Sequence, residues 1–186
     1  MKISIRTSEN KGTAIDLFKE LLKLEGDQLL LSTGYLTSPE LLPADEIVRS
    51  VSSIALAVGR WEGKSHSLAA VKGNAAKFVG HLRESAARLG KPVPELFLYA
   101  GESWHSKVAI KRIAAAIIGS SNVSKRSLGG KSNYLNHEVD ILITEDDGDD
   151  AKRELEMLYK ALANSLKGHF KANRASLGTA PAKASK

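Results

Sequence analysis

The chain has 186 residues, of which 42% are hydrophobic and 26% are charged, and it contains no cysteine. The composition is that of a globular domain, and the missing cysteines exclude disulfides, thiolate catalysis, thiolate zinc sites and iron–sulfur clusters. The formal net charge of +6 favours polyanionic partners. No apolar run reaches the roughly 18 residues of a membrane helix, and residues 1–10 lack a signal-peptide core, so we expect a cytoplasmic protein without a membrane partner.

The first half of the chain alternates strand and helix patterns. Short apolar runs indicate strands, and apolar residues at helical spacing indicate helices, with glycine and proline marking the breaks. In chain order the patterns predict a strand over 3–6, a helix over 13–24, a strand over 28–35, a short helix from Asp45, a strand over 53–58, a helix over 65–89 and a strand over 95–99.

The second half predicts paired buried strands over 107–110 and 113–118, another strand over 139–144 and a helix over 151–166. The acidic residues of segment 145–150 precede that helix, where negative charge suits the helix dipole; a metal site is the alternative interpretation. The segment after Gly168 is poor in apolar bulk. We therefore predict an α/β fold with one domain over 1–170, a mixed and largely parallel sheet with helices on both faces, and a flexible basic tail over 171–186.

Candidate chemistry concentrates between residues 103 and 131, a stretch with six basic residues and no carboxylate. His105 and Lys107 are two apart on a predicted strand, so their side chains share one face and can meet one ligand. The segment Gly119-Ser120-Ser121-Asn122 follows an apolar strand, and backbone amides in such a turn can cradle an anion.

In these residues the sequence resembles the phospholipase D superfamily. The superfamily signature is His-x-Lys, four residues, Asp, six residues, then Gly-x-x-Asn, and His105, Lys107, Gly119 and Asn122 match it. Segment 136–138, Asn-His-Glu, is similar to the Asn-x-Glu that follows the signature in the nuclease-like branch. Arg112 occupies the Asp position, which is a departure from the pattern. It could pair with Glu102 or Asp140, or contact nucleic acid.

The resemblance implies the fold above and a catalytic set of His105, Lys107, Ser120, Asn122 and Glu138. A neutral imidazole at His105 can attack phosphorus and form a phosphohistidine. Lys107, Ser120 and Asn122 can stabilise the charge on the nonbridging oxygens, and Glu138 can accept the other ring N–H. Further phosphate or nucleic-acid contacts are expected from the neighbouring residues Lys111, Arg112, Ser121, Lys125 and Arg126.

The signature occurs once in the chain, whereas the family mechanism uses two histidines. Small single-motif members solve this by forming a dimer, so we expect a homodimer with one composite site. The expected activity is that of a weakly specific, metal-independent endonuclease without a cofactor. It would act on nucleic acid, DNA in preference to RNA, alone or within a larger restriction or repair assembly. A phosphatidyl or other phosphodiester transferase and an inactive nucleic-acid-binding module are the alternatives.

Overall fold

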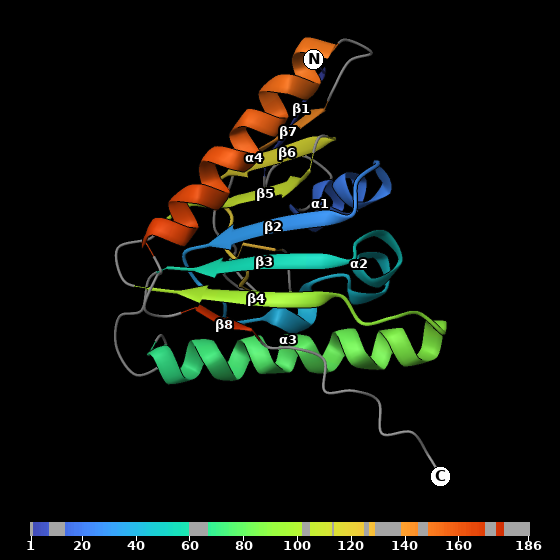
Figure 1. The fold of residues 1–186 in the computed structure, drawn as a ribbon, viewed down its shortest axis with the longest axis vertical. Helices are drawn as coiled ribbons and strands as arrows, with labels where there is room; N and C mark the ends of the chain where they lie inside the picture. The colour runs from blue at the N-terminus through green and yellow to red at the C-terminus, as the bar shows by residue number, and fades with distance from the viewer. Residues whose placement is uncertain are drawn as a thin grey trace.

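The computed structural model describes residues 2–7, 14–59, 67–101, 105–112, 114–124, 127–128, 139–144, 149–169 and 174–176. Its strands form one sheet in the order β1-β7-β6-β5-β2-β3-β4-β8 (Figure 1). In chain order the elements are β1 Lys2–Thr7, α1 Ala14–Lys23, β2 Gln28–Thr33, the 3₁₀ helix η1 Pro39–Leu41, α2 Ala44–Ser50, β3 Ser53–Val58, α3 Leu68–Leu89, β4 Glu95–Ala100, β5 Val108–Lys111, β6 Ala115–Gly119, β7 Val139–Thr144, α4 Asp149–His169 and β8 Arg174–Ser176.

The sheet is mixed, as the sequence predicts, but antiparallel pairing predominates. Strands β2, β3 and β4 pair in parallel. The five other pairings between described strands are antiparallel. This corrects the expectation of a largely parallel sheet. The physical reason is the short connection between β5 and β6, which permits a hairpin but is too short for a parallel crossover.

Helices α1, α2 and α3 cover one face of the sheet. The apolar stripe of α1 is buried against this face and consists of Leu17, Phe18, Leu21 and Leu22. The helical spacing of these residues in the sequence predicted this helix because one face of it is buried. The long helix α3 begins after Ser67, whose side chain accepts a hydrogen bond from the Ala70 amide, and ends at Gly90, whose φ of 61° favours glycine.

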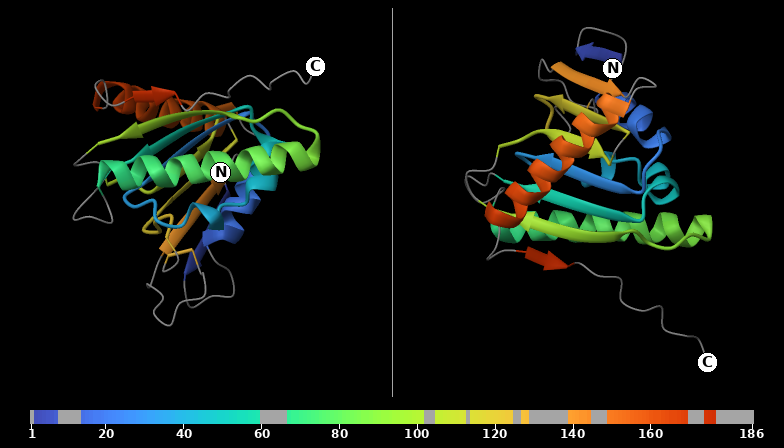
Figure 2. Two further views of the ribbon diagram at one scale, coloured as in Figure 1. Left: turned by 90° about the horizontal axis from the view of Figure 1, so that it is seen from below. Right: turned by 45° about the horizontal axis from the view of Figure 1, so that its top comes forward.

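Helix α4 crosses the opposite face of the sheet, as Figure 2 shows. Its inward residues Leu155, Tyr159, Leu162 and Leu166 pack against side chains of β2, β4, β5 and β6. Asp149 and Asp150 lie in its first turn, which agrees with the helix-dipole interpretation of the acidic segment. The expectation of helices on both faces is therefore confirmed.

The C-terminal segment differs in one respect from the expected flexible tail. Residues Arg174–Ser176 form β8, which pairs with Phe97–Tyr99 at the β4 edge of the sheet. This strand was not predicted from the sequence because the segment has few apolar residues. It forms a strand through its pairing with β4. In the described part of the chain, no helix is long and apolar enough to cross a membrane.

Candidate active site

Several chain segments meet at one edge of the sheet. The antiparallel registers place Ser32 of β2 opposite Val108 of β5, and Val108 opposite Ile118 of β6. Gly119 in turn lies opposite Asp140 of β7. The end of β2, the start of β5, the end of β6 and the start of β7 therefore come together. The histidine–lysine pair and the glycine–asparagine segment of the signature both lie at this edge.

His105 and Lys107 are in direct contact. The Lys107 Nζ lies 2.8 Å from His105 Nε2 and 3.2 Å from Nδ1. An ammonium only donates hydrogen bonds, and a neutral imidazole has one unprotonated nitrogen that can accept, so the tautomer decides which of the two ring nitrogens binds Lys107. The His105 side chain is exposed to solvent. The pair therefore places an imidazole ring next to a cation at the surface.

Asn122 is held beside this pair by the end of β2. Its Oδ1 accepts hydrogen bonds from the Tyr35 amide at 3.1 Å and from the Thr33 hydroxyl at 3.4 Å. The Thr33 oxygen also accepts from the Val123 amide at 3.1 Å. Since the carboxamide oxygen faces β2, the amide N–H₂ group is available for a ligand on the other side.

Gly34 brings the two halves of the signature together. A Cβ at this position would lie 2.7 Å from His105 Cδ2, 3.1 Å from His105 Nε2 and 3.0 Å from Asn122 Oδ1. Both signature side chains are therefore in contact with the Gly34 backbone. The Tyr35 ring meets the His105 ring edge-on, with centroids 6.4 Å apart. The turn after β2 thus forms one wall of the site.

A buried carboxylate orders the glycine–asparagine segment. Asp140 is 5% exposed and accepts hydrogen bonds from the Ser121 amide at 3.2 Å and from the Ser121 hydroxyl at 2.5 Å. A Cβ on Gly119 would overlap this carboxylate. The signature glycine is thus required because the Asp140 side chain lies against it. Ser121, expected to contact phosphate, instead uses its hydroxyl to bind Asp140.

Ser120, which the sequence placed in the catalytic set, has its side chain at the first residue of β7. The Ser120 hydroxyl accepts a hydrogen bond from the Val139 amide at 3.0 Å, and Ser120 is exposed at the start of β7. The structure therefore ties Ser120 to the first residue of β7. Glu138, Lys125 and Arg126, which the sequence also assigned to the site, lie outside the described residues.

Lys111 corrects one expectation of the sequence. It was expected to contact substrate phosphate, but its side chain is only 2% exposed and lies at the far end of β5. Its Nζ donates to the carbonyl oxygen of Leu22 at 2.8 Å and to that of Leu24. Burial lowers the pKa of this ammonium from its ordinary value. Strand alternation places Lys111 on the face of Lys107, and this face is covered by α1.

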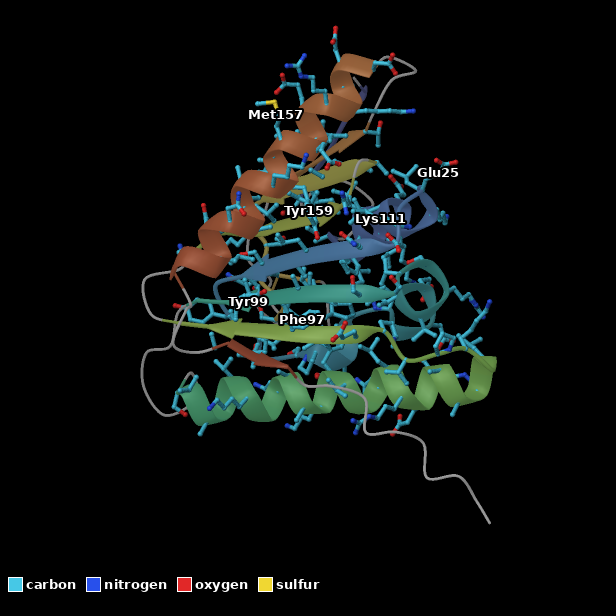
Figure 3. All side chains as sticks on the ribbon, in the orientation of Figure 1. Glu25, Phe97, Tyr99, Lys111, Met157 and Tyr159 are labelled. Atoms are coloured by element: carbon cyan, nitrogen blue, oxygen red, sulfur yellow. The ribbon has the colours of Figure 1, made fainter. Side chains whose placement is uncertain are left out.

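Arg112 corrects a second expectation. It was expected to contact phosphate or pair with Glu102 or Asp140, yet it donates to Gln28 Oε1 at 3.0 Å and to Glu156 Oε1 at 3.3 Å. The guanidinium also lies over the Tyr159 ring of α4, 5.9 Å from its centroid. Tyr159, labelled beside α4 in Figure 3, packs against side chains of the strands that α4 covers. Arg112 is five strand residues from Lys107, which corresponds to about 16 Å along the strand. It is therefore too distant to touch a phosphate bound at His105.

The residues that the sequence missed are Thr33, Gly34 and Tyr35. Thr33 is the last residue of β2 and the other two follow it, about 70 residues before the signature in the chain. A small polar Ser32-Thr33-Gly34 run after an apolar strand is a signal that could have indicated a strand end at a site. Among the residues that the structure describes, no group of three or more histidine, cysteine, aspartate or glutamate side chains is arranged so that it could hold a metal ion.

No family model matches the sequence, and no curated protein matches it. Solved structures do resemble the fold. Nuc from Salmonella typhimurium, a phospholipase D family member, superposes with a TM-score of 0.59 at 14% identity over 96% of this chain and 99% of that one. NucT from Helicobacter pylori gives 0.56 at 14% identity over 90% and 96% of the two chains.

A third solved structure, phosphatidylserine synthase from Haemophilus influenzae Rd KW20, gives a TM-score of 0.51 at 13% identity. The match covers 94% of this chain but 40% of the synthase. These similarities show that the chain has the phospholipase D fold, as the signature residues predicted. The four residues that match the signature, His105, Lys107, Gly119 and Asn122, lie at one edge of that fold.

Proposed function

We propose that this chain, which has the phospholipase D fold, is a phosphodiesterase that cleaves nucleic acid through a phosphohistidine at His105, with one site shared by two subunits. The observation that supports the proposal is the convergence of three side chains from the two halves of the signature. Lys107 Nζ is 2.8 Å from His105 Nε2, and Asn122 Oδ1 lies beside the same Gly34 position as the ring. A phosphate placed at Nε2 would meet all three.

In the first step the lone pair of His105 Nε2 forms a bond to phosphorus, and the bond from phosphorus to the leaving oxygen breaks. The contact between Lys107 and Nε2 must give way at this point, and a bound phosphate supplies nonbridging oxygens for the ammonium instead. The Asn122 N–H₂ group can donate to the same oxygens. These donors stabilise the charge that develops in the transition state.

The leaving oxygen needs a proton, and we assign this role to the imidazolium of His105 of the partner subunit. In the second step, water attacks phosphorus, the nitrogen–phosphorus bond breaks and the partner imidazole takes the proton from water. Each subunit would thus supply one histidine, and the catalyst returns to its initial protonation state. Glu138 is proposed to accept the second ring N–H of His105.

Nucleic acid is proposed as substrate, DNA in preference to RNA, because the chain carries a net charge of +6 and a basic stretch around the signature. Among the described residues, the exposed large hydrophobic side chains are Ile118, Val139 and Met157. We propose weak sequence specificity, since the chain offers no recognisable base-reading motif.

The activity test incubates single- and double-stranded DNA and RNA with the protein in excess EDTA. Wild type is expected to cleave, whereas His105→Ala and Lys107→Ala are expected to lose turnover, and vanadate is expected to inhibit. The matched control is Lys77→Gln on the exposed face of α3, which removes one positive charge far from the site. Cleavage that stops in EDTA, or that survives His105→Ala, would contradict the mechanism.

The shared site is tested by mixing subunits. Wild type and His105→Ala are co-refolded in equal amounts, and the dimer is verified by light scattering. If both histidines serve one reaction, random pairing leaves about one quarter of the dimers active, against about one half of the activity for independent sites. A strictly monomeric active species would exclude the shared site.

A transferase is the second candidate, favoured by the fold similarity to phosphatidylserine synthase. The same phosphohistidine could pass its phosphoryl group to an alcohol instead of water. Turnover of phospholipid with intact DNA would establish this function. Binding of nucleic acid that persists without cleavage in both wild type and His105→Ala would instead identify an inactive binding module.

A further inference from the structure

A basic pocket lies at the opposite end of β5 from His105. It has a volume of about 400 Å³ and is bounded by the C-terminal ends of α1 and α2 and by Lys111. Figure 3 labels Lys111 at the right-hand ends of the strands. Lys107 and Lys111 are separated by four strand residues, or about 13 Å, so this pocket is distinct from the site at Lys107.

Positive charge predominates in the lining. Lys19, Lys23, Arg49 and Lys111 contribute cations, and Glu46 is the one carboxylate among the lining residues. The Lys19 ammonium lies 3.9 Å from Glu46, so one cation is already compensated. The C-terminal ends of α1 and α2 together contribute at most about one negative charge. Since the side chains carry a net charge of +3, the pocket favours an anion despite these two dipoles.

Lys111 forms the floor of the pocket. Two of its three N–H groups are accounted for by the carbonyl oxygens of Leu22 and Leu24, and these are its hydrogen-bond partners within the described ranges. The side chain is 2% exposed and lines the pocket. A buried N–H group without an acceptor is costly, and a ligand oxygen in the pocket would satisfy it. Burial also lowers the pKa of Lys111, and a bound anion would counter this effect.

Gly26 keeps the floor open. Its φ is +102°, and a Cβ there would lie 2.6 Å from the Arg112 carbonyl oxygen. Glycine is therefore required by both backbone conformation and space. The turn brings the backbone close to Lys111, whose Cγ would lie 3.5 Å from the same Cβ position. The ammonium, the turn and the two basic helix ends thus enclose one concave space.

We propose that this pocket binds a phosphate group at a site separate from the catalytic edge. Lys111 would donate its third N–H group from below, and Lys23 and Arg49 would contact the anion from the rim. The phosphate could be a free anion or part of a nucleic-acid chain, because the recognising chemistry is the same. The site does not depend on the proposed nuclease activity.

The test is an NMR titration of ¹⁵N-labelled protein with inorganic phosphate, followed by a titration with an unphosphorylated single-stranded oligonucleotide. Phosphate is expected to shift the amides of Lys23, Gly26 and Ser50 saturably, in addition to any shifts near Asn122. Shifts of the three pocket amides by the oligonucleotide would identify a chain phosphate as the ligand, and their absence would identify a free phosphate group.

Variants separate the pocket from the catalytic edge. Arg49→Gln is expected to weaken phosphate binding at Gly26 about tenfold, because it removes one charge-assisted hydrogen bond. Lys77→Gln on α3 has the same charge change and should leave this binding unchanged, and Lys107→Ala should affect only the other site. The proposal is overturned if neither ligand shifts the pocket amides, or if Arg49→Gln binds phosphate as tightly as wild type. Arg49 is exposed, so this variant is expected to fold.

Discussion

Replacing Gly34 with alanine tests whether the end of β2 positions His105, the proposed nucleophile. The new Cβ would lie 2.7 Å from His105 Cδ2 and 3.0 Å from Asn122 Oδ1. Carbon atoms prefer separations of about 3.5–4.0 Å, so the ring must move by about 1 Å. The Gly34 backbone lies outside the left-handed region, so alanine itself introduces no backbone strain there.

The imidazole is expected to yield, because the Asn122 side chain is fixed by Thr33 and Tyr35 while the His105 side chain is exposed. A misplacement of about 1 Å at a reacting atom typically costs about 100-fold in rate. We therefore expect Gly34→Ala to lower kcat about 100-fold. The thermal unfolding temperature should change little, since the displaced group is at the surface.

The assay combines steady-state cleavage of a phosphodiester substrate with thermal unfolding. The matched control is Gly73→Ala in α3, where nothing lies within 4 Å of the added Cβ. This control should stabilise the helix by about 0.5–1 kcal/mol and leave kcat unchanged. A folded Gly34→Ala protein with kcat near the wild-type value would refute the inference that Gly34 sets the position of His105.

Three further substitutions test the surrounding structure. Ser121→Ala removes the hydrogen bond from the Ser121 hydroxyl to the buried Asp140 carboxylate, and with it part of the order of the turn that holds Ser121. The free energy of unfolding should fall by about 1–3 kcal/mol in denaturant unfolding, and kcat should also fall. An unchanged denaturation midpoint would contradict this prediction. Arg112→Asp, which restores the residue type of the signature, should lower stability by repulsion from Glu156 and give no gain in kcat, so a rate increase would contradict the assignment of Arg112 to α4. Because burial lowers the pKa of Lys111 below its ordinary 10.5, the unfolded chain binds more protons at alkaline pH, and the stability of wild type relative to Lys111→Met should rise as pH approaches 10.5. A flat or falling difference in unfolding free energy would show that this burial does not destabilise the ammonium.

The signature residues could be predicted because their information is local. His105 and Lys107 are two residues apart on an extended segment, and this spacing alone puts them on one face. The elements also followed from local patterns, such as the buried stripe of α1. β8 could not be predicted, because three residues of low apolar content become a strand only through pairing with β4.

The sequence by itself determined the alternation of helices and strands, the positive charge and the spacing of the catalytic candidates. Only the tertiary structure decided which neighbours those candidates have. Gly34 and His105 are distant in the chain, and Ser121, which follows β6, meets Asp140 on the adjacent strand β7. Lys111 and Arg112 look alike in sequence, yet alternation sends one beneath α1 and the other towards α4. The physical reason is that burial and partners depend on strand register and on which helix covers each face, and both are set by contacts between distant segments.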